Sequence, residues 1–203
     1  MTEPRDGDAL IIVDVQKDFL PGGALAVKEG DRIVPLLNRY IEKFQRLGLP
    51  IVATRDWHPP DHCSFKSRGG PWPAHCIAGT SGAEFAEGLR LPPNTLIVSK
   101  ATRADQEAYS GFERTGLAEK LKRLGVTRLF IGGLATEYCV LNTVRDAIEK
   151  GFRVVVLSDA MRAVNANPGD EAKALEQMRQ WGAEFVRLQS ASRETSLPDS
   201  GQP

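Results

Sequence analysis

The chain is organised around one stretch in its second half, Leu129-Phe130-Ile131-Gly132-Gly133-Leu134-Ala135-Thr136-Glu137-Tyr138-Cys139. The apolar start is typical of a buried strand, and the glycine pair is typical of a sharp turn. The residues that follow predict a helix with Cys139 in its first turn. Unpaired N–H groups and the dipole at a helix N-terminus favour a thiolate and can hold an oxyanion beside it. A small cysteine packed in a core helix is the alternative, because free cysteines are among the most buried residues.

Length and composition bound the class of protein. The 203 residues are 41% hydrophobic and 26% charged, which predicts a single globular domain over residues 1–203 with a full core. Lys+Arg and Asp+Glu number 26 each, so nothing predicts binding to nucleic acid or to an anionic membrane, and small neutral substrates suit this balance. We expect flexible tails at residues 1–8 and 190–203, where polar and charged residues dominate.

The cellular compartment follows from what the sequence lacks. No apolar run approaches the length of a transmembrane helix, and the polar, acidic start does not resemble a signal peptide. The three cysteines, Cys63, Cys76 and Cys139, make an odd count without paired metal-type spacing. This argues against a disulfide framework and agrees with a reducing compartment, so we expect a cytoplasmic protein.

Apolar runs alternate with helical patterns along the whole chain. The helix expected over residues 33–47 keeps helical spacing of its apolar side chains and has Asp31 as its expected N-cap. The alternation predicts an α/β fold with a doubly wound, mostly parallel six-stranded sheet and helices on both faces. The expected strands are residues 9–13, 51–54, 95–98, 128–131, 154–157 and 183–188.

Four reactive side chains, Asp14, Asp56, Lys100 and Cys139, each follow the end of a different expected strand. Ligands of an open parallel sheet bind outside the carboxyl ends of its strands, so these side chains should converge. Asp14 can then take the proton of Cys139, while Lys100 holds Asp14 ionised and favours the thiolate. Taken singly, the aspartate could cap a turn and the lysine could snorkel at the sheet edge.

All three histidines, His58, His62 and His75, lie in one loop region. Asp56 and His58 are two residues apart and can point the same way, and the other two can close round to complete an Asp/His₃ site. Such ligands suit one divalent metal ion (Zn, Fe or Mn) and leave positions for water or substrate. A surface loop, or one that binds anions or caps turns, is the alternative. No histidine is left to act as the base for Cys139.

Five motifs together resemble the nicotinamidase/pyrazinamidase family of the isochorismatase-like cysteine hydrolases, in the same order, from about residue 10 to residue 188. The motif around Cys139 alone indicates only the superfamily, whereas the loop with Trp72 to Cys76 is specific to nicotinamidases. The motifs are Asp14-Val15-Gln16-Lys17-Asp18-Phe19, Asp56-Trp57-His58, Trp72-Pro73-Ala74-His75-Cys76, Tyr109-Ser110-Gly111-Phe112 and Ala135-Thr136-Glu137-Tyr138-Cys139-Val140.

The resemblance assigns roles residue by residue. It implies a cis peptide between Leu134 and Ala135 and an oxyanion hole made by the N–H groups of Ala135 and Cys139. Glu137 stands where many relatives have Asp or His, and we expect no functional consequence, since an acid remains favourable in a first helical turn. The implied residues are the catalytic triad Asp14, Lys100 and Cys139, the metal ligands Asp56, His58, His62 and His75, and the ring pocket Phe19, Trp72, Leu134, Ala135 and Tyr109.

The implied reaction is hydrolysis of nicotinamide to nicotinate and ammonia through a Cys139 thioester, in NAD salvage, with pyrazinamide as a further substrate. The expected partner is thus a small molecule, and neither a nucleic acid nor a membrane is expected. The sequence is compatible with a homo-oligomer. A related cysteine amidase that acts on another small amide or carbamoyl compound is the alternative enzyme. An isochorismate ether hydrolase would leave the metal loop and Cys139 without a purpose. A metal-dependent scaffold or a thiol redox sensor is the alternative from a different class.

Overall fold

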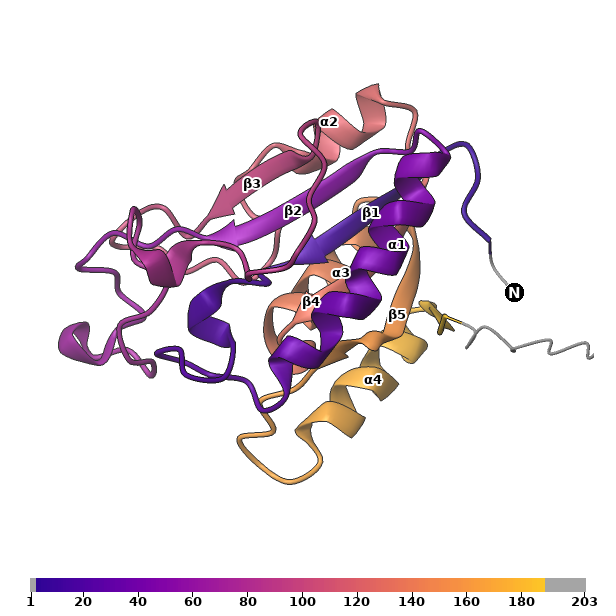
Figure 1. Cartoon of the computed structure of the whole chain (residues 1–203). Coiled ribbons are helices and arrows are strands. Elements are labelled where there is room, and N and C mark those ends of the chain that lie inside the picture. Colours follow the sequence, from indigo (N-terminus) through magenta and orange to yellow (C-terminus); the bar gives the residue numbers. More distant parts are fainter. Residues whose placement is uncertain (1–2, 189–203) are drawn as a thin grey trace, which may run out of the picture.

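The computed structural model describes residues 3–188, so the tail predicted at residues 190–203 lies outside the described residues, as do residues 1 and 2. The sheet is parallel throughout and has the strand order β3-β2-β1-β4-β5-β6 (Figure 1), which confirms the predicted fold class. Among residues 3–188, no helix has both the length and the apolar character needed to span a bilayer. The strands are β1 Asp8–Val13, β2 Ile51–Asp56, β3 Leu96–Lys100, β4 Arg128–Leu134, β5 Arg153–Arg162 and β6 Glu184–Val186.

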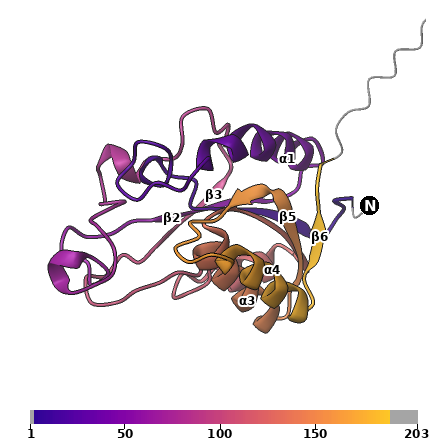
Figure 2. The same cartoon turned by 90° about the horizontal axis from the view of Figure 1, so that it is seen from below.

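The helices are divided unequally between the two faces of the sheet (Figure 2). Helix α1 (Val34–Arg46) packs Leu37 and Ile41 against one face, next to Leu10 and Ile12 of β1. Helices α2 (Leu117–Arg123), α3 (Leu141–Glu149) and α4 (Asp170–Gln180) cover the other face. The inequality arises because β2 and β3 are joined by a long connection, residues 57–95, with only short 3₁₀ turns in place of a covering helix.

Strand β4 passes very close to β1 near its end, and the glycine pair allows this approach. Gly133 has φ 135°, and a Cβ atom there would lie 2.0 Å from the carbonyl oxygen of Val13. The pairing of β4 with β5 shifts register between Ile131 and Gly133. The turn that carries Cys139 therefore starts from a bulged strand end that only glycine can form.

Two predicted boundaries are wrong. Asp8 does not belong to a flexible tail: it is buried in β1, where its carboxylate accepts hydrogen bonds from Arg128 Nε at 2.8 Å and Nη2 at 2.5 Å. Asp31 is not the N-cap of α1, because a 3₁₀ turn, Gly30–Ile33, precedes that helix and places Ile33 at the cap. The polar sequence around Asp8 gave no sign of its distant partner, Arg128. The sequence around Asp31 likewise gave no sign of the 3₁₀ turn before α1.

Candidate active site

The carboxyl ends of the first four strands bring the predicted reactive side chains together. Asp14 follows β1, while Asp56 and Lys100 are the last residues of β2 and β3 and are directly paired across the sheet. Cys139 comes from the turn after β4. Ligand atoms of Asp14, Asp56 and Cys139 all lie within 4.8 Å of one another.

Lys100 stands at the centre of this group and is 2% exposed. Its Nζ lies 2.9 Å from Asp14 Oδ2 and 2.5 Å from Asp56 Oδ1. It is also 3.4 Å from Cys139 Sγ and donates a hydrogen bond to the carbonyl oxygen of Ala108 at 3.2 Å. Burial by itself would lower the pKa of Lys100, but the two carboxylates outweigh burial and raise that pKa, so the side chain is an ammonium ion.

Burial acts in the same direction on the pKa of the acid and of the thiol that flank Lys100. Burial raises the pKa of Asp14, against the opposing effect of Lys100 and of Thr54 Oγ1, which donates a hydrogen bond to Asp14 Oδ1 at 2.6 Å. Burial also raises the pKa of the Cys139 thiol well above its usual range, and Lys100 only partly opposes this. Among the protein's own groups, burial and the two carboxylates thus oppose ionisation of Cys139, and Lys100 favours it.

Cys139 lies on a single π-helical turn, η5 (Thr136–Val140), which leads directly into α3. Ala135 caps this turn in an extended conformation, and the Leu134–Ala135 peptide is cis, as the resemblance implies. The sequence pattern predicted a regular helix start here. The wider turn holds the sulfur inside the molecule, with Cys139 6% exposed.

A second group of side chains lies beside the first and has the character of a metal site. Ligand atoms of Asp56, His58 and His75 all lie within 4.8 Å of one another, and all three residues are buried. Both ring nitrogens of His58 are buried without a hydrogen-bond partner among residues 3–188, which is costly for an imidazole unless a ligand completes it. The His75 Nδ1–H donates to the carbonyl oxygen of Pro73 at 2.8 Å, so the lone pair is on Nε2. The donor set fits a divalent Zn, Fe or Mn ion.

His62 lies next to this group but is engaged elsewhere. Its ring centroid is 4.2 Å from that of His58. The Nε2 atom of His62 is hydrogen-bonded to the carbonyl oxygen of Gln106 at 3.0 Å, and Nδ1 to Ser64 Oγ at 2.8 Å. The structure thus brings three of the four predicted metal ligands together and leaves His62 beside them.

A cavity opens onto Cys139, His58 and His75, and most of the predicted ring pocket lines it. Leu134 does not line it, and its side chain is fully buried in the core on the α1 side. Trp72 Nε1 donates to the hydroxyl of Tyr109 at 3.0 Å, which fixes one wall. The other predicted lining residues are Phe19, Trp72, Tyr109 and Ala135, and those not predicted are Leu25, Val27, Glu107, Tyr138 and Val164.

Two residues of the motif after β1 support the site from behind. The amide of Gln16 donates to the carbonyl oxygen of Asp56 at 2.8 Å and accepts from the N–H of Asp56 at 2.7 Å. Asp18 accepts from the N–H of Cys76 at 2.7 Å, next to His75. Both residues belong to the predicted motif Asp14 to Phe19, but the motif alone did not predict these contacts. A polar motif that directly follows a buried strand is the signal for such contacts.

Comparison with known proteins places this site in a family. The family model described as Isochorismatase domain matches residues 8–190. The chain is 36% identical over 201 residues to the nicotinamidase of Escherichia coli, covering 89% of this chain and 94% of the relative. The zinc complex of Pyrococcus horikoshii pyrazinamidase superposes with a TM-score of 0.86 at 54% identity, covering 90% of this chain and 99% of the other. The nicotinate complex of PnC1 from L. infantum superposes with a TM-score of 0.85 at 35% identity, covering 92% of this chain and 96% of the other.

Proposed function

The chain belongs to the isochorismatase domain family, and we propose that it is a nicotinamidase. It would hydrolyse nicotinamide to nicotinate and ammonia and would also deamidate pyrazinamide. One observation carries the proposal. A cysteine with an adjacent carboxyl and ammonium group shares one aromatic-walled cavity with an Asp/His/His group. The similarity to nicotinamidases and pyrazinamidases over most of the chain supports the same substrate.

The first half of the reaction uses Asp14 as a base. Asp14 takes the proton of Cys139 Sγ, and the sulfur attacks the carbonyl carbon of the amide. The N–H groups of Ala135 and Cys139 donate to the oxyanion that forms. Asp14 then passes its proton to the departing nitrogen, the C–N bond breaks, and ammonia leaves behind a thioester on Cys139.

The second half returns the protein to its starting state. A water molecule gives a proton to Asp14 and attacks the thioester carbon, and the C–S bond breaks to release nicotinate. Asp14 returns its proton to the sulfur. Lys100 stays an ammonium ion throughout, because it balances the two carboxylates of Asp14 and Asp56.

The residues that would hold one divalent cation are Asp56, His58 and His75, with His62 as a fourth ligand once it gives up one of its present hydrogen bonds. When bound, a Zn, Fe or Mn ion there supplies a Lewis acid for the pyridine nitrogen of the substrate or for water. Phe19, Trp72 and Tyr109 provide flat apolar walls for the pyridine ring.

We further propose that the protein works in the cytoplasm, in NAD salvage. The three free cysteines agree with a reducing compartment. All residues with a proposed role come from one chain, so the chemistry needs no second subunit. A homo-oligomer is compatible with this arrangement.

The deciding experiment measures ammonia release from nicotinamide, pyrazinamide and benzamide by purified protein of known metal content. We expect turnover of the first two, and a kcat/KM for benzamide lower by up to about 10⁴-fold, because benzamide lacks the ring nitrogen. Turnover of another small amide or carbamoyl compound without turnover of nicotinamide would instead favour a related cysteine amidase. Bound metal with no amide turnover would favour the scaffold or the redox sensor.

A further inference from the structure

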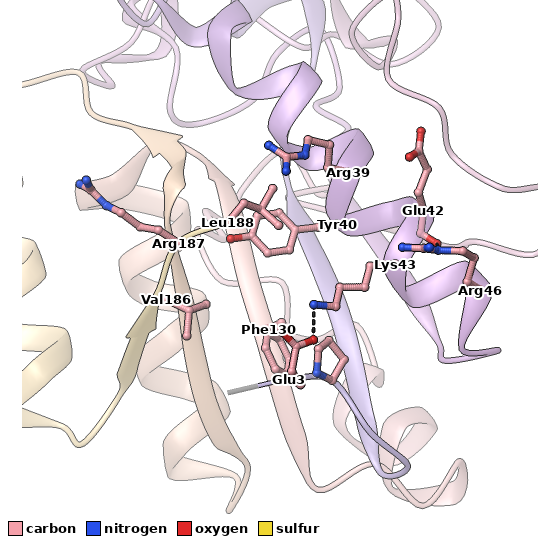
Figure 3. A pocket seen from close by; sticks show the side chains of 11 residues that line it. Glu3, Arg39, Tyr40, Glu42, Lys43, Arg46, Phe130, Val186, Arg187 and Leu188 are labelled. Atoms are coloured by element: carbon pink, nitrogen blue, oxygen red, sulfur yellow. Dashed lines mark hydrogen bonds and ion pairs between the residues drawn. The ribbon is translucent and has the colours of Figure 1, made fainter. Parts of the chain in front are cut away.

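A second cavity, of about 290 Å³, lies on the α1 side of the sheet (Figure 3). It is bounded by α1, by Glu3 and Pro4 ahead of β1, and by residues 186–188 at the end of β6. Ligand pockets hold about 300–1,000 Å³, so its size is just below the lower end of that range. It shares no lining residue with the cavity over Cys139.

The rim of this second cavity has an excess of positive charge. Arg39, Lys43 and Arg46 come from α1 at spacings that put them on one side of the helix, and Arg187 comes from the opposite wall (Figure 3). Two carboxylates also line it. Glu3 is paired with Lys43, and Glu42 is 3.4 Å from Arg90, which lies outside the cavity. The rim thus carries four cations and two carboxylates, and Arg187 Nε also donates to Ser158 Oγ at 3.3 Å.

The floor of the second cavity is apolar and fixed in place. Phe130, Val186 and Leu188 contribute to it, together with the ring of Tyr40. The Tyr40 hydroxyl donates to Asp159 Oδ1 at 2.9 Å, and Asp159 Oδ2 accepts from the N–H of Leu188 at 2.9 Å. Asp159 therefore ties α1 to the chain after β6 and preforms the space between them.

We propose that the second cavity binds a phosphate monoester carried on an apolar body of about nucleoside size. Three of the four rim cations are arginines, whose planar guanidinium groups bind phosphate in pairs of parallel hydrogen bonds. Inorganic phosphate alone would leave most of the 290 Å³ unfilled and the apolar floor uncovered. The ligand thus needs both an anionic group and an apolar part.

Isothermal titration of the full-length protein tests this site, with adenosine monophosphate as probe and inorganic phosphate and adenosine as its two halves. We expect the monophosphate to bind at least about tenfold more tightly than either half, and more weakly as salt is added. The double variant R39A/R187A should weaken binding by about tenfold or more, whereas Arg123→Ala on α2 should leave it unchanged. Nicotinamide turnover should persist in all three proteins.

Three outcomes would overturn the proposal: a monophosphate that binds no more tightly than inorganic phosphate, an equal loss in Arg123→Ala, or displacement of the monophosphate by nicotinamide. The last would place the probe in the cavity over Cys139.

Glu137 is linked to one wall of the catalytic cavity through a neighbouring loop. Val164 lines that cavity, and the next residue, Asn165, has a left-handed backbone with φ 51°. The N–H of Asn165 donates to Glu137 Oε1 at 2.6 Å, and Asn165 Oδ1 accepts from the N–H of Glu171 at 3.0 Å. The loop that carries Val164 is thus tied both to the turn of Cys139 and to the first turn of α4.

The position of this wall matters because the catalytic cavity is narrow. It has a volume of about 40 Å³, well below the roughly 300 Å³ at which ligand pockets usually begin. The position of each wall therefore determines how closely a ring-sized substrate fits. We infer, resting on the proposed function, that Glu137 is a positioning residue that sets Val164 against the substrate through Asn165. This differs from the expectation that the acid at this position has no functional consequence.

Three variants separate this role from a general effect of an acid in the first helical turn. Glu137→Ala should raise KM for nicotinamide by about tenfold with kcat changed by less than about threefold, and Val164→Ala should do the same. Glu137→Gln keeps a carbonyl oxygen as acceptor and should restore KM to within about twofold of wild type. Glu176→Ala, on the exposed side of α4, is the control and should change neither constant.

An unchanged KM in Glu137→Ala, or a Glu137→Gln variant as impaired as Glu137→Ala, would overturn the inference. A wild-type protein without nicotinamide turnover would instead contradict the proposed function, so the two failures are distinguishable. Val164→Ala keeps the test decisive if Glu137→Ala does not fold.

Discussion

Lys100 Nζ lies 2.9 Å from Asp14 Oδ2, and neither side chain has any exposed surface. The pair is not isolated, because Asp56 lies on the same ammonium group. Two carboxylates around one ammonium group leave the cluster with a negative balance, and both carboxylates raise the pKa of the neighbouring Cys139 thiol. The thiol must therefore pass its proton to a group inside the cluster when it attacks, and Asp14 is placed to receive it.

Cys139→Ala should abolish amide turnover and leave the fold and the metal content unchanged, because the sulfur forms the covalent bond and alanine suits its helical turn. Ammonia release and elemental analysis check this. Cys63→Ala, at a half-buried cysteine that does not line the cavity, is the matched control and should stay within about threefold of wild type. Residual turnover within about tenfold of wild type in Cys139→Ala would rule out the nucleophile.

Asp14→Asn and Lys100→Met should each lower kcat by about 10³-fold or more, and the double variant should be little worse than either, because the groups act as a unit. Their effects on stability should differ. Lys100→Met leaves two buried carboxylates without a counter-charge, which costs about 3–5 kcal/mol, whereas asparagine keeps the shape of Asp14. Denaturant unfolding of both variants measures this difference. Equal stabilities would mean that Lys100 does not balance the cluster.

Metal content should depend on the individual histidines. We expect about one divalent ion per chain in the wild-type protein, lost on His58→Ala or His75→Ala, because each removes a nitrogen donor of the buried group. His62→Ala should retain more metal, since both nitrogens of His62 are engaged in other hydrogen bonds. Elemental analysis of purified variants decides this, and active enzyme without stoichiometric metal would refute the assignment.

Gly133→Ala should destabilise the protein far more than Gly151→Ala. Both glycines have a positive φ, so alanine is strained at each by about 1 kcal/mol. Only at Gly133 would the new Cβ lie 2.0 Å from the backbone of Val13, whereas nothing lies within 4 Å at Gly151. We expect an additional loss of about 3 kcal/mol or more at Gly133, or no folded protein, as measured by thermal unfolding. Similar losses at both sites would show that β1 and β4 can separate without penalty.

The sequence predicted those parts of the site that depend on strand ends. Long apolar runs mark the strands, and a parallel sheet gathers the residues after them, so Asp14, Asp56, Lys100 and Cys139 could be predicted to meet. The clustering of histidines in one loop likewise predicted a metal group.

The features that sequence reasoning missed depend on contacts that no local pattern encodes. Val164 and Glu107 reach the catalytic cavity from loops without any periodic signal, so their position could not be read from neighbouring residues. Leu134 was assigned by resemblance alone, and no local pattern shows that its side chain lies in the core on the α1 side. Asp8 looked like part of a polar tail because its partner, Arg128, is 120 residues away.

A cysteine whose sulfur is buried is poorly oxidised, because peroxides react with exposed thiolates. Cys139 is 6% exposed, and burial raises its pKa well above the usual range. A redox sensor needs the opposite, an accessible thiol with a low pKa. Because the sulfur of Cys139 is buried, catalysis should outlast a peroxide pulse that inactivates enzymes with an exposed thiolate.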